Sequence, residues 1–177
     1  MRVNLASNPR LSTKLNKFQD SRLEQSKLVK GAVIKYFEDF AVGEVTVTRA
    51  RTITETDIVN FAGLTGDWYP LHTDAEYSKR GPFGERIAHG MLILSIATGL
   101  MPLYDMAIVA FYGMDKVRFT APTKIGDTIH VELEVVEKQD KGDIGGVITL
   151  KESVKNQQGE DVAVSTKKVL IAKRPNT

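Results

Sequence analysis

The stretch Ala88-His-Gly-Met-Leu-Ile-Leu-Ser-Ile-Ala-Thr-Gly-Leu-Met101 is almost wholly apolar and carries small residues at several positions. A helix of this composition is buried on most of its surface, and Pro102 marks its end. Its longest apolar run, residues 91–96, is interrupted by Ser95 and is too short to span a bilayer. The stretch therefore predicts a helix at the centre of a folded domain, with no membrane partner.

Strand-like segments with turn residues between them follow this helix. Apolar and polar residues alternate from Ile129 to Val135, which is the period of a half-buried strand. The predicted strands cover about residues 114–121, 128–138, 146–155 and 161–172. Gly-Asp, Lys-Gly-Asp and Gln-Gly sequences separate them and are typical of hairpins. We expect an α+β fold in which an antiparallel sheet wraps around a central apolar helix. Because such a sheet leaves one edge unprotected, we also expect a homodimer or higher homo-oligomer.

The sequence before the helix predicts shorter elements. Residues 44–53 alternate as one strand would. The sequence Thr54-Glu-Thr-Asp57 has the spacing of a capping box and predicts a helix through Phe61, ended by Gly63 and Gly66. A further short helix is expected over 75–79, followed by a loop.

Length and composition bound the class of protein. A chain of 177 residues suits one domain with a substantial core. The absence of cysteine excludes thiolate nucleophiles and cysteine-bound metals, and it fits a reducing compartment, so we expect a cytoplasmic protein. The amino-terminal segment does not have the order of a secretory signal.

Charge separates a basic N-terminal extension, residues 1–32, from the predicted domain, residues 33–177. The extension carries seven Lys or Arg against two acidic residues, although the net charge of the whole chain is only +2. Its single aromatic residue, Phe18, argues against a nucleic-acid partner, which needs a basic face with aromatic side chains. A mitochondrial targeting peptide is one interpretation. An extension that packs on a neighbouring molecule is the favoured one.

The stretch Phe61-Ala-Gly-Leu-Thr-Gly-Asp-Trp-Tyr-Pro-Leu-His72 places Asp67 and His72 five residues apart around a proline turn. A carboxylate and an imidazole held in this way can share one water molecule and activate it. Taken alone, Asp67 would more often cap a turn, and His72 would more often be a structural histidine.

Together with the start of the apolar helix, this stretch resembles the signature of the MaoC-like hydratases and dehydratases, including the (R)-specific enoyl-CoA hydratases. The family pattern runs through an aromatic residue, Ser/Thr-Gly-Asp, a variable residue, Asn-Pro, an apolar residue, His and a small residue six positions later. The matching positions here are Phe61, Thr65, Gly66, Asp67, Trp68, Tyr69, Pro70, Leu71, His72 and Ser78. Tyr69 departs from the pattern by standing where the family usually has Asn. The resemblance covers about residues 36–172.

The resemblance implies a single hot-dog fold, an acyl thioester of coenzyme A or acyl carrier protein as substrate, and reversible addition of water to a trans-2-enoyl group, as in fatty acid metabolism. It implies that Asp67 and His72 are the catalytic pair and that the Gly90 N–H binds the thioester oxygen. No metal or other cofactor is expected. The predicted substrate-binding residues are Trp68, Tyr69, Pro70, Met91 and Arg86. The alternatives are aromatic packing for Trp68 and Tyr69, a place in the core for Met91, and a solvated charged loop for Arg86.

Two other functions stay open at this point. A thioesterase on the same fold would use a carboxylate to activate water against the thioester carbonyl. A non-catalytic acyl-thioester-binding subunit is the other alternative, and Tyr69 is the feature that favours it. The spacing of Asp67 and His72 favours the hydro-lyase.

Overall fold

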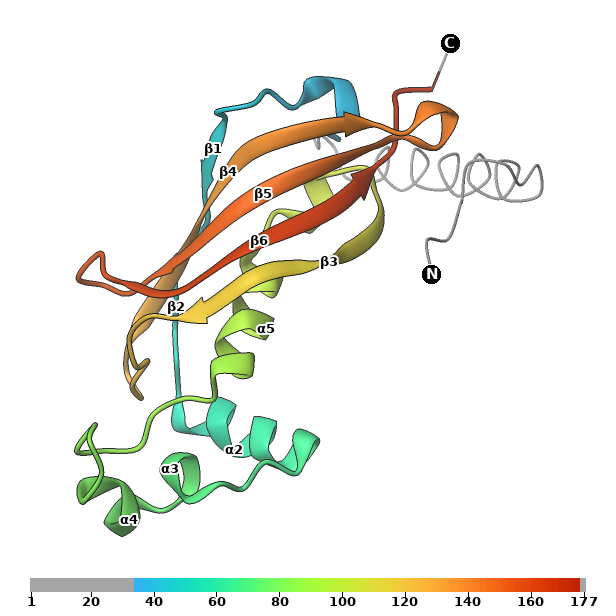
Figure 1. Cartoon of the computed structure of the whole chain (residues 1–177). Coiled ribbons are helices and arrows are strands. Elements are labelled where there is room, and N and C mark those ends of the chain that lie inside the picture. Colours follow the sequence, from blue (N-terminus) through green and yellow to red (C-terminus); the bar gives the residue numbers. More distant parts are fainter. Residues whose placement is uncertain (1–33, 176–177) are drawn as a thin grey trace.

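The computed structural model describes residues 34–175, so the expected extension over residues 1–32 lies outside the described part. An antiparallel sheet with strand order β1-β4-β5-β6-β3 forms its main layer, and β2 pairs with β4 (Figure 1). The strands are β1 (Val45–Val47), β2 (Arg51–Thr52), β3 (Ile108–Phe119), β4 (Thr128–Asp140), β5 (Gly146–Lys155) and β6 (Asp161–Ile171). Short 3-10 helices lie at η2 (Phe37–Asp39), η3 (Leu103–Asp105) and η4 (Gly142–Ile144).

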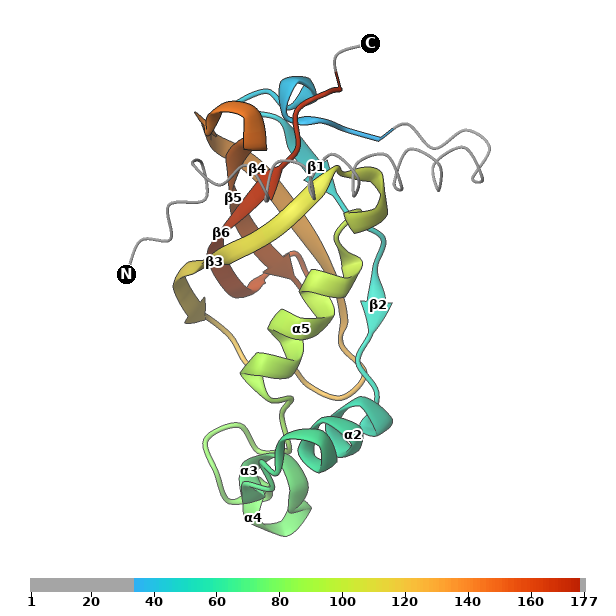
Figure 2. The ribbon, with the colours of Figure 1, turned by 90° about the vertical axis from the view of Figure 1, so that its right-hand side faces the viewer.

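The apolar stretch forms helix α5 (Gly90–Leu100), which lies along the inner side of the curved sheet (Figure 2). Its buried residues are Leu92, Ile93, Leu94, Ile96, Ala97 and Leu100. They pack in one core with the inward residues of β4, among them Ile129 and Val131, which are fully buried. The predicted sheet around a central helix is confirmed. Among the helices of residues 34–175, none is long and apolar enough to cross a membrane.

Most predicted strands are confirmed, but β3 begins at Ile108 rather than near residue 114. Its pairing with β6 shifts register at three places, between Ile108 and Ala110, between Phe111 and Gly113, and between Asp115 and Arg118. Each shift reverses the side of the sheet that later residues face. The simple alternation that marks a strand in the sequence is therefore lost over the first half of β3.

The strand expected over residues 44–53 is divided into β1 and β2, and Thr48 explains the division. The Thr48 N–H donates to the Val131 carbonyl at 2.9 Å, as a strand residue would. The Val131 N–H, however, donates to the Thr48 hydroxyl at 3.0 Å instead of to a backbone carbonyl. A side chain thus replaces one backbone acceptor of the ladder, and regular pairing stops there.

Helices α2 (Glu55–Thr65), α3 (Pro70–Thr73) and α4 (Ala75–Lys79) form a layer beyond the end of the sheet, here called the overhang (Figure 1). The predicted capping box is confirmed, because Thr54 and Asp57 bond each other's backbone N–H. The helix runs through Gly63 and ends at Gly66, whose φ of 77° is in the left-handed region that favours glycine. The prediction that α4 covers residues 75–79 is also confirmed.

A fully buried ion pair lies under the C-terminal half of α5. Lys167 of β6 and Glu152 of β5 are both 0% exposed, and their charged atoms are 2.5 Å apart. Lys167 also donates to the Thr98 hydroxyl at 3.0 Å, and the Ser165 hydroxyl donates to Glu152 at 2.7 Å. Two charges removed from water are tolerated here because each has a partner of opposite charge and a further hydrogen bond.

Candidate active site

Asp67 lies in the loop between α2 and α3, directly after the glycine that ends α2. Its N–H donates to the Thr65 hydroxyl at 3.3 Å, and the same hydroxyl donates to the Phe61 carbonyl at 2.7 Å. The Asp67 carboxylate accepts the Tyr69 backbone N–H at 3.3 Å. Two of these contacts hold the Asp67 backbone to the end of α2, and the third orients its exposed carboxylate.

His72 belongs to the single turn of α3, which begins at Pro70, the first-turn position that proline favours. Its Nδ1 atom lies 2.8 Å from the Ile87 carbonyl oxygen. Since a carbonyl only accepts, Nδ1 carries the hydrogen and Nε2 presents a lone pair. The buried Ser78 hydroxyl lies 3.2 Å and 3.1 Å from the Pro70 and Leu71 carbonyls, which ties α4 to this turn.

The start of α5 brings a backbone donor to the same place. Gly90 is the first residue of α5, and no acceptor among residues 34–175 pairs with its N–H. The tip of the Phe119 ring, at the end of β3, packs so closely on Gly90 that a Cβ there would lie 2.6 Å from a ring carbon. Only glycine fits this position without a shift of the ring.

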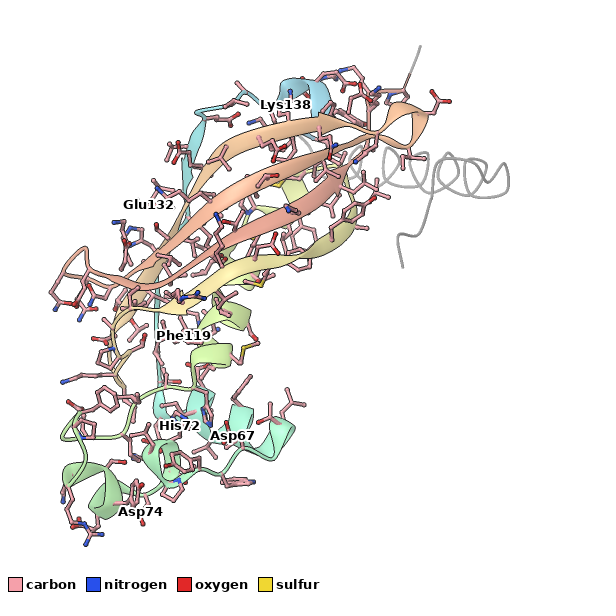
Figure 3. All side chains as sticks on the ribbon, viewed as in Figure 1. Asp67, His72, Asp74, Phe119, Glu132 and Lys138 are labelled. Atoms are coloured by element: carbon pink, nitrogen blue, oxygen red, sulfur yellow. The ribbon has the colours of Figure 1, made fainter. Side chains whose placement is uncertain are left out.

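A cavity of about 390 Å³, here called the site cavity, opens where these groups meet. Figure 3 shows Asp67 and His72 on the overhang facing the start of α5, with Phe119 above them. The cavity is lined by Asp67, His72, Phe83, Ile87, Ala88, His89, Gly90, Met91, Ile93, Phe119, Thr120, Ala121, Pro122, Thr123 and Val162. The predicted catalytic residues thus come together from three separate elements.

Asp67, His72 and His89 each offer one ligand atom, and these atoms lie within 4.8 Å of one another. That spacing suits a shared water molecule. A metal ion is a poorer fit, because the rings of His72 and His89 are stacked with centroids 3.9 Å apart and planes 29° from parallel. Lone pairs lie in the ring planes, so those of two stacked imidazoles do not converge on one point. The expectation that the site uses no metal stays a prediction.

The predicted substrate-binding residues divide into two groups. Met91 lines the site cavity and is 59% exposed, so it does not belong to the core. Trp68, Tyr69, Pro70 and Arg86 do not line that cavity. Tyr69 instead lines a second cavity of about 450 Å³ beside α4, and its hydroxyl lies 3.4 Å from that of Tyr77. A role for these four residues in binding stays a prediction.

Arg86 has a partner within the chain. Its guanidinium donates two hydrogen bonds to the Glu55 carboxylate, at 2.8 and 2.6 Å. The hydrogen bond from Arg86 lowers the pKa of Glu55, and the same contact raises the pKa of Arg86. This pair joins the first turn of α2 to the segment that leads into α5.

Three residues of the site, Phe119, Ile87 and Thr123, are not predicted from the sequence. Ile87 accepts from the His72 ring, and the Thr123 carbonyl accepts the Ala88 N–H at 2.8 Å. Both contacts are made by backbone carbonyl groups. Every residue has such a group, so the residue type gives no indication of the contact. The sequence predicts Phe119 only as a strand residue. Its contact with Gly90 could not be predicted, because it depends on how β3 passes α5.

Residues 39–157 match the model of the MaoC like domain family. The chain therefore belongs to this family, and the hot-dog arrangement implied by the resemblance is confirmed. A crystal structure from Archaeoglobus described as a monoamine oxidase regulatory protein is 47% identical, with a TM-score of 0.76. The match covers 80% of this chain and 97% of that one.

Two curated relatives are similar over the same region. The chain is 44% identical over 105 residues to Protein MaoC of Klebsiella aerogenes, a match that covers 59% of this chain and 31% of that protein. It is 36% identical over 103 residues to the (R)-specific enoyl-CoA hydratase of Rhodospirillum rubrum, a match that covers 58% of this chain and 71% of that protein. The chain thus spans about a third of the length of the first relative and a larger share of the second.

Proposed function

We propose that this chain is a hydro-lyase that adds water reversibly to a trans-2-enoyl thioester of coenzyme A or acyl carrier protein. One observation carries the proposal: Asp67, His72 and Gly90 line a single cavity, and the Gly90 N–H has no acceptor within residues 34–175. Relatives named as hydratases and dehydratases support the same class of reaction.

In the proposed mechanism a water molecule sits between the Asp67 carboxylate and the Nε2 lone pair of His72. Asp67 removes one proton, His72 accepts the second hydrogen as a hydrogen bond, and the water oxygen adds to the β-carbon. Asp67 then gives the proton that it removed from the water to the α-carbon, so one H and one OH are added across the double bond and the carboxylate is regenerated. Positioned acid–base groups typically accelerate a reaction by about 10²–10⁴-fold.

Negative charge develops on the thioester oxygen as the water adds. We infer that the Gly90 N–H binds this oxygen, because it is the first donor of an eleven-residue helix and no residue among 34–175 accepts a hydrogen bond from it. The partial positive charge at the start of a helix adds to this hydrogen bond. Met91 and Phe119 supply the apolar wall that the acyl group needs.

The test is incubation of the purified full chain with crotonyl-CoA, following the ultraviolet absorbance of the enoyl thioester with free thiol assayed in parallel. Loss of absorbance without thiol supports the hydro-lyase. Release of thiol would instead identify a thioesterase. If crotonyl-CoA and longer enoyl-CoA and carrier-protein thioesters all bind without turnover, the chain is an acyl-binding subunit.

Tyr69, which stands in place of the usual Asn, does not argue against catalysis. The Asp67 carboxylate accepts a hydrogen bond from the backbone N–H of residue 69. Every residue except proline has this N–H, so Tyr keeps the bond as Asn would. The Tyr69 ring meets the His72 ring edge-on at 6.4 Å between centroids, so it borders the pair without displacing it.

We also propose a homodimer formed along β3. Within residues 34–175, β3 is the last strand of the sheet and pairs only with β6, so one of its edges is free. Phe111 and Phe119 on this strand are each 51% exposed. The end of β3 lines the site cavity, so a second copy there would lie beside the active site. Sedimentation equilibrium of the full chain tests this, and a monomer at micromolar concentration would refute it. A cytoplasmic location stays a prediction.

A further inference from the structure

His89 contacts both members of the proposed catalytic pair, although no chemistry was assigned to it from the sequence. Its ring is 2% exposed and lies between the rings of His72 and Phe61, with centroid distances of 3.9 and 5.1 Å. Its Nε2 atom lies 3.0 Å from the backbone carbonyl oxygen of Asp67. His89 also precedes Gly90 directly, at the N-cap of α5.

We propose that His89 is a positioning residue that holds Asp67 and His72 in register with the Gly90 N–H. The His89 ring contacts the overhang at two points, the His72 ring and the Asp67 backbone carbonyl. The ring fixes the Asp67 backbone by a hydrogen bond and the tilt of the His72 ring by stacking. The Asp67 carboxylate, the His72 ring and the Gly90 N–H are then all positioned relative to the start of α5.

The hydrogen-bond pattern of His89 suits this role rather than direct chemistry. The Asp67 carbonyl only accepts, so Nε2 carries the hydrogen and is occupied. The remaining Nδ1 atom is buried and has no partner among residues 34–175. His89 therefore supports the pair without exchanging protons with the substrate.

This inference rests on the proposed function, and two substitutions separate the two contacts. His89→Phe keeps an aromatic ring against His72 but removes the donor to Asp67. His89→Gln keeps an amide donor but removes the ring. We expect His89→Phe to lower kcat for crotonyl-CoA by about 10–100-fold, because small misplacements of reacting groups have effects of this size. His89→Gln should recover part of that loss, and KM should change by no more than about twofold for both, because the proposed contacts of His89 are to the catalytic pair and not to the substrate.

A spectroscopic readout tests positioning without turnover. The chain has three histidines, at positions 72, 89 and 130, so ¹⁵N–¹H correlation spectra of the imidazoles are simple to assign. In the wild-type protein, His72 should give the signals of a single tautomer with hydrogen on Nδ1. In His89→Ala, loss of the stacked ring should shift and broaden the His72 ring signals, because the Ile87 carbonyl holds the tautomer but not the tilt of the ring. His130→Ala is the matched control, since His130 lies on β4 and contacts Glu132 at 3.8 Å.

The outcomes are distinct. The inference is overturned if His89→Phe retains wild-type kcat, or if the His72 ring signals in His89→Ala are the same as in the wild-type protein. It is also overturned if every His89 variant loses thermal stability and raises KM along with the fall in kcat, because His89 would then be a packing residue. If the wild-type protein hydrates no enoyl thioester, the proposed function fails, and the His72 spectra still decide whether His89 positions that ring.

Discussion

The two ends of helix α5 carry two polar clusters of opposite character. At the N-terminal end, Asp67 and His72 face a cavity, and in the described part of the chain the Gly90 N–H has no backbone acceptor. At the C-terminal end, Lys167 and Glu152 are fully buried and bonded to each other. The same helix and the same sheet support both clusters. We interpret the accessible groups at the N-terminal end as the proposed site of chemistry, and the buried ion pair at the C-terminal end as a part of the core that stabilises the fold.

Breaking the N-terminal cluster should have the largest effect on activity. His72→Ala should lower the rate of enoyl-CoA hydration by about 10²–10⁴-fold, the typical contribution of a positioned acid–base group. The free energy of unfolding should change little, since His72 is only half-buried. His130→Ala, on the outer part of β4, should leave the rate unchanged. Equal rates for His72→Ala and the wild-type protein would remove His72 from the mechanism.

Breaking the C-terminal cluster should act on stability alone. Lys167→Met leaves the Glu152 carboxylate buried without its cation, which we expect to lower the free energy of unfolding by about 3–5 kcal/mol. Lys167→Met combined with Glu152→Leu should recover most of that loss, because apolar replacement of a whole buried pair is often neutral. Urea denaturation gives both values. A single substitution that costs nothing would show that the pair is not buried as the structure has it.

Gly90→Ala tests the close contact at the N-terminal end. The added methyl group would overlap the Phe119 ring, so we expect a loss of about 1–3 kcal/mol in stability and a fall in hydration rate. Gly99→Ala is the control on the same helix, because a Cβ there meets nothing within 4 Å. Replacing Phe119 with Leu in the Gly90→Ala protein should restore stability. Failure of that rescue would mean that the ring does not limit position 90.

The smallest effect is expected at the pair that joins the overhang to the segment before α5. Arg86 lowers the pKa of Glu55, so this pair stabilises the folded state at neutral pH. That contribution is lost as the pH falls through the folded-state pKa, which lies below the ordinary glutamate value of about 4.3. For a pair this exposed, Glu55→Gln should cost about 0.2–1 kcal/mol at pH 7.

Chemical denaturation of Glu55→Gln at several pH values checks this expectation. The difference from the wild-type protein should stay constant from neutral pH down to about pH 5 and shrink from there to about pH 3. A difference that stays constant over that range would indicate that packing of the side chain, rather than its charge, is responsible.

The contrast also explains how far the sequence predicts the structure. The sheet is well predicted where one face is apolar, as in β5, whose predicted bounds of 146–155 are confirmed. The prediction is wrong where a side chain or a bulge replaces regular pairing, at Thr48 and along β3. Local alternation does not report contacts of this kind, because they depend on a neighbouring strand.

The two polar clusters at the ends of α5 also differ in how well the sequence predicts them. The motif identified Asp67, His72 and Gly90, and the structure brings them to one cavity. The sequence could not show which of the adjacent Lys167 and Lys168 is buried, since one register shift exchanges them. It also could not show that His89 stacks on His72, because the contact joins segments that only the fold brings together.

The most direct test of the account compares Asp67→Asn with Asp74→Asn in the crotonyl-CoA assay, with free thiol measured in parallel. Asp67 lines the site cavity, whereas Asp74 caps α4 by accepting the Tyr77 N–H, a role that Asn also fills. The account predicts that Asp67→Asn loses hydration by about 10²–10⁴-fold while Asp74→Asn keeps the wild-type rate and neither releases thiol. Full hydration by Asp67→Asn would contradict the account.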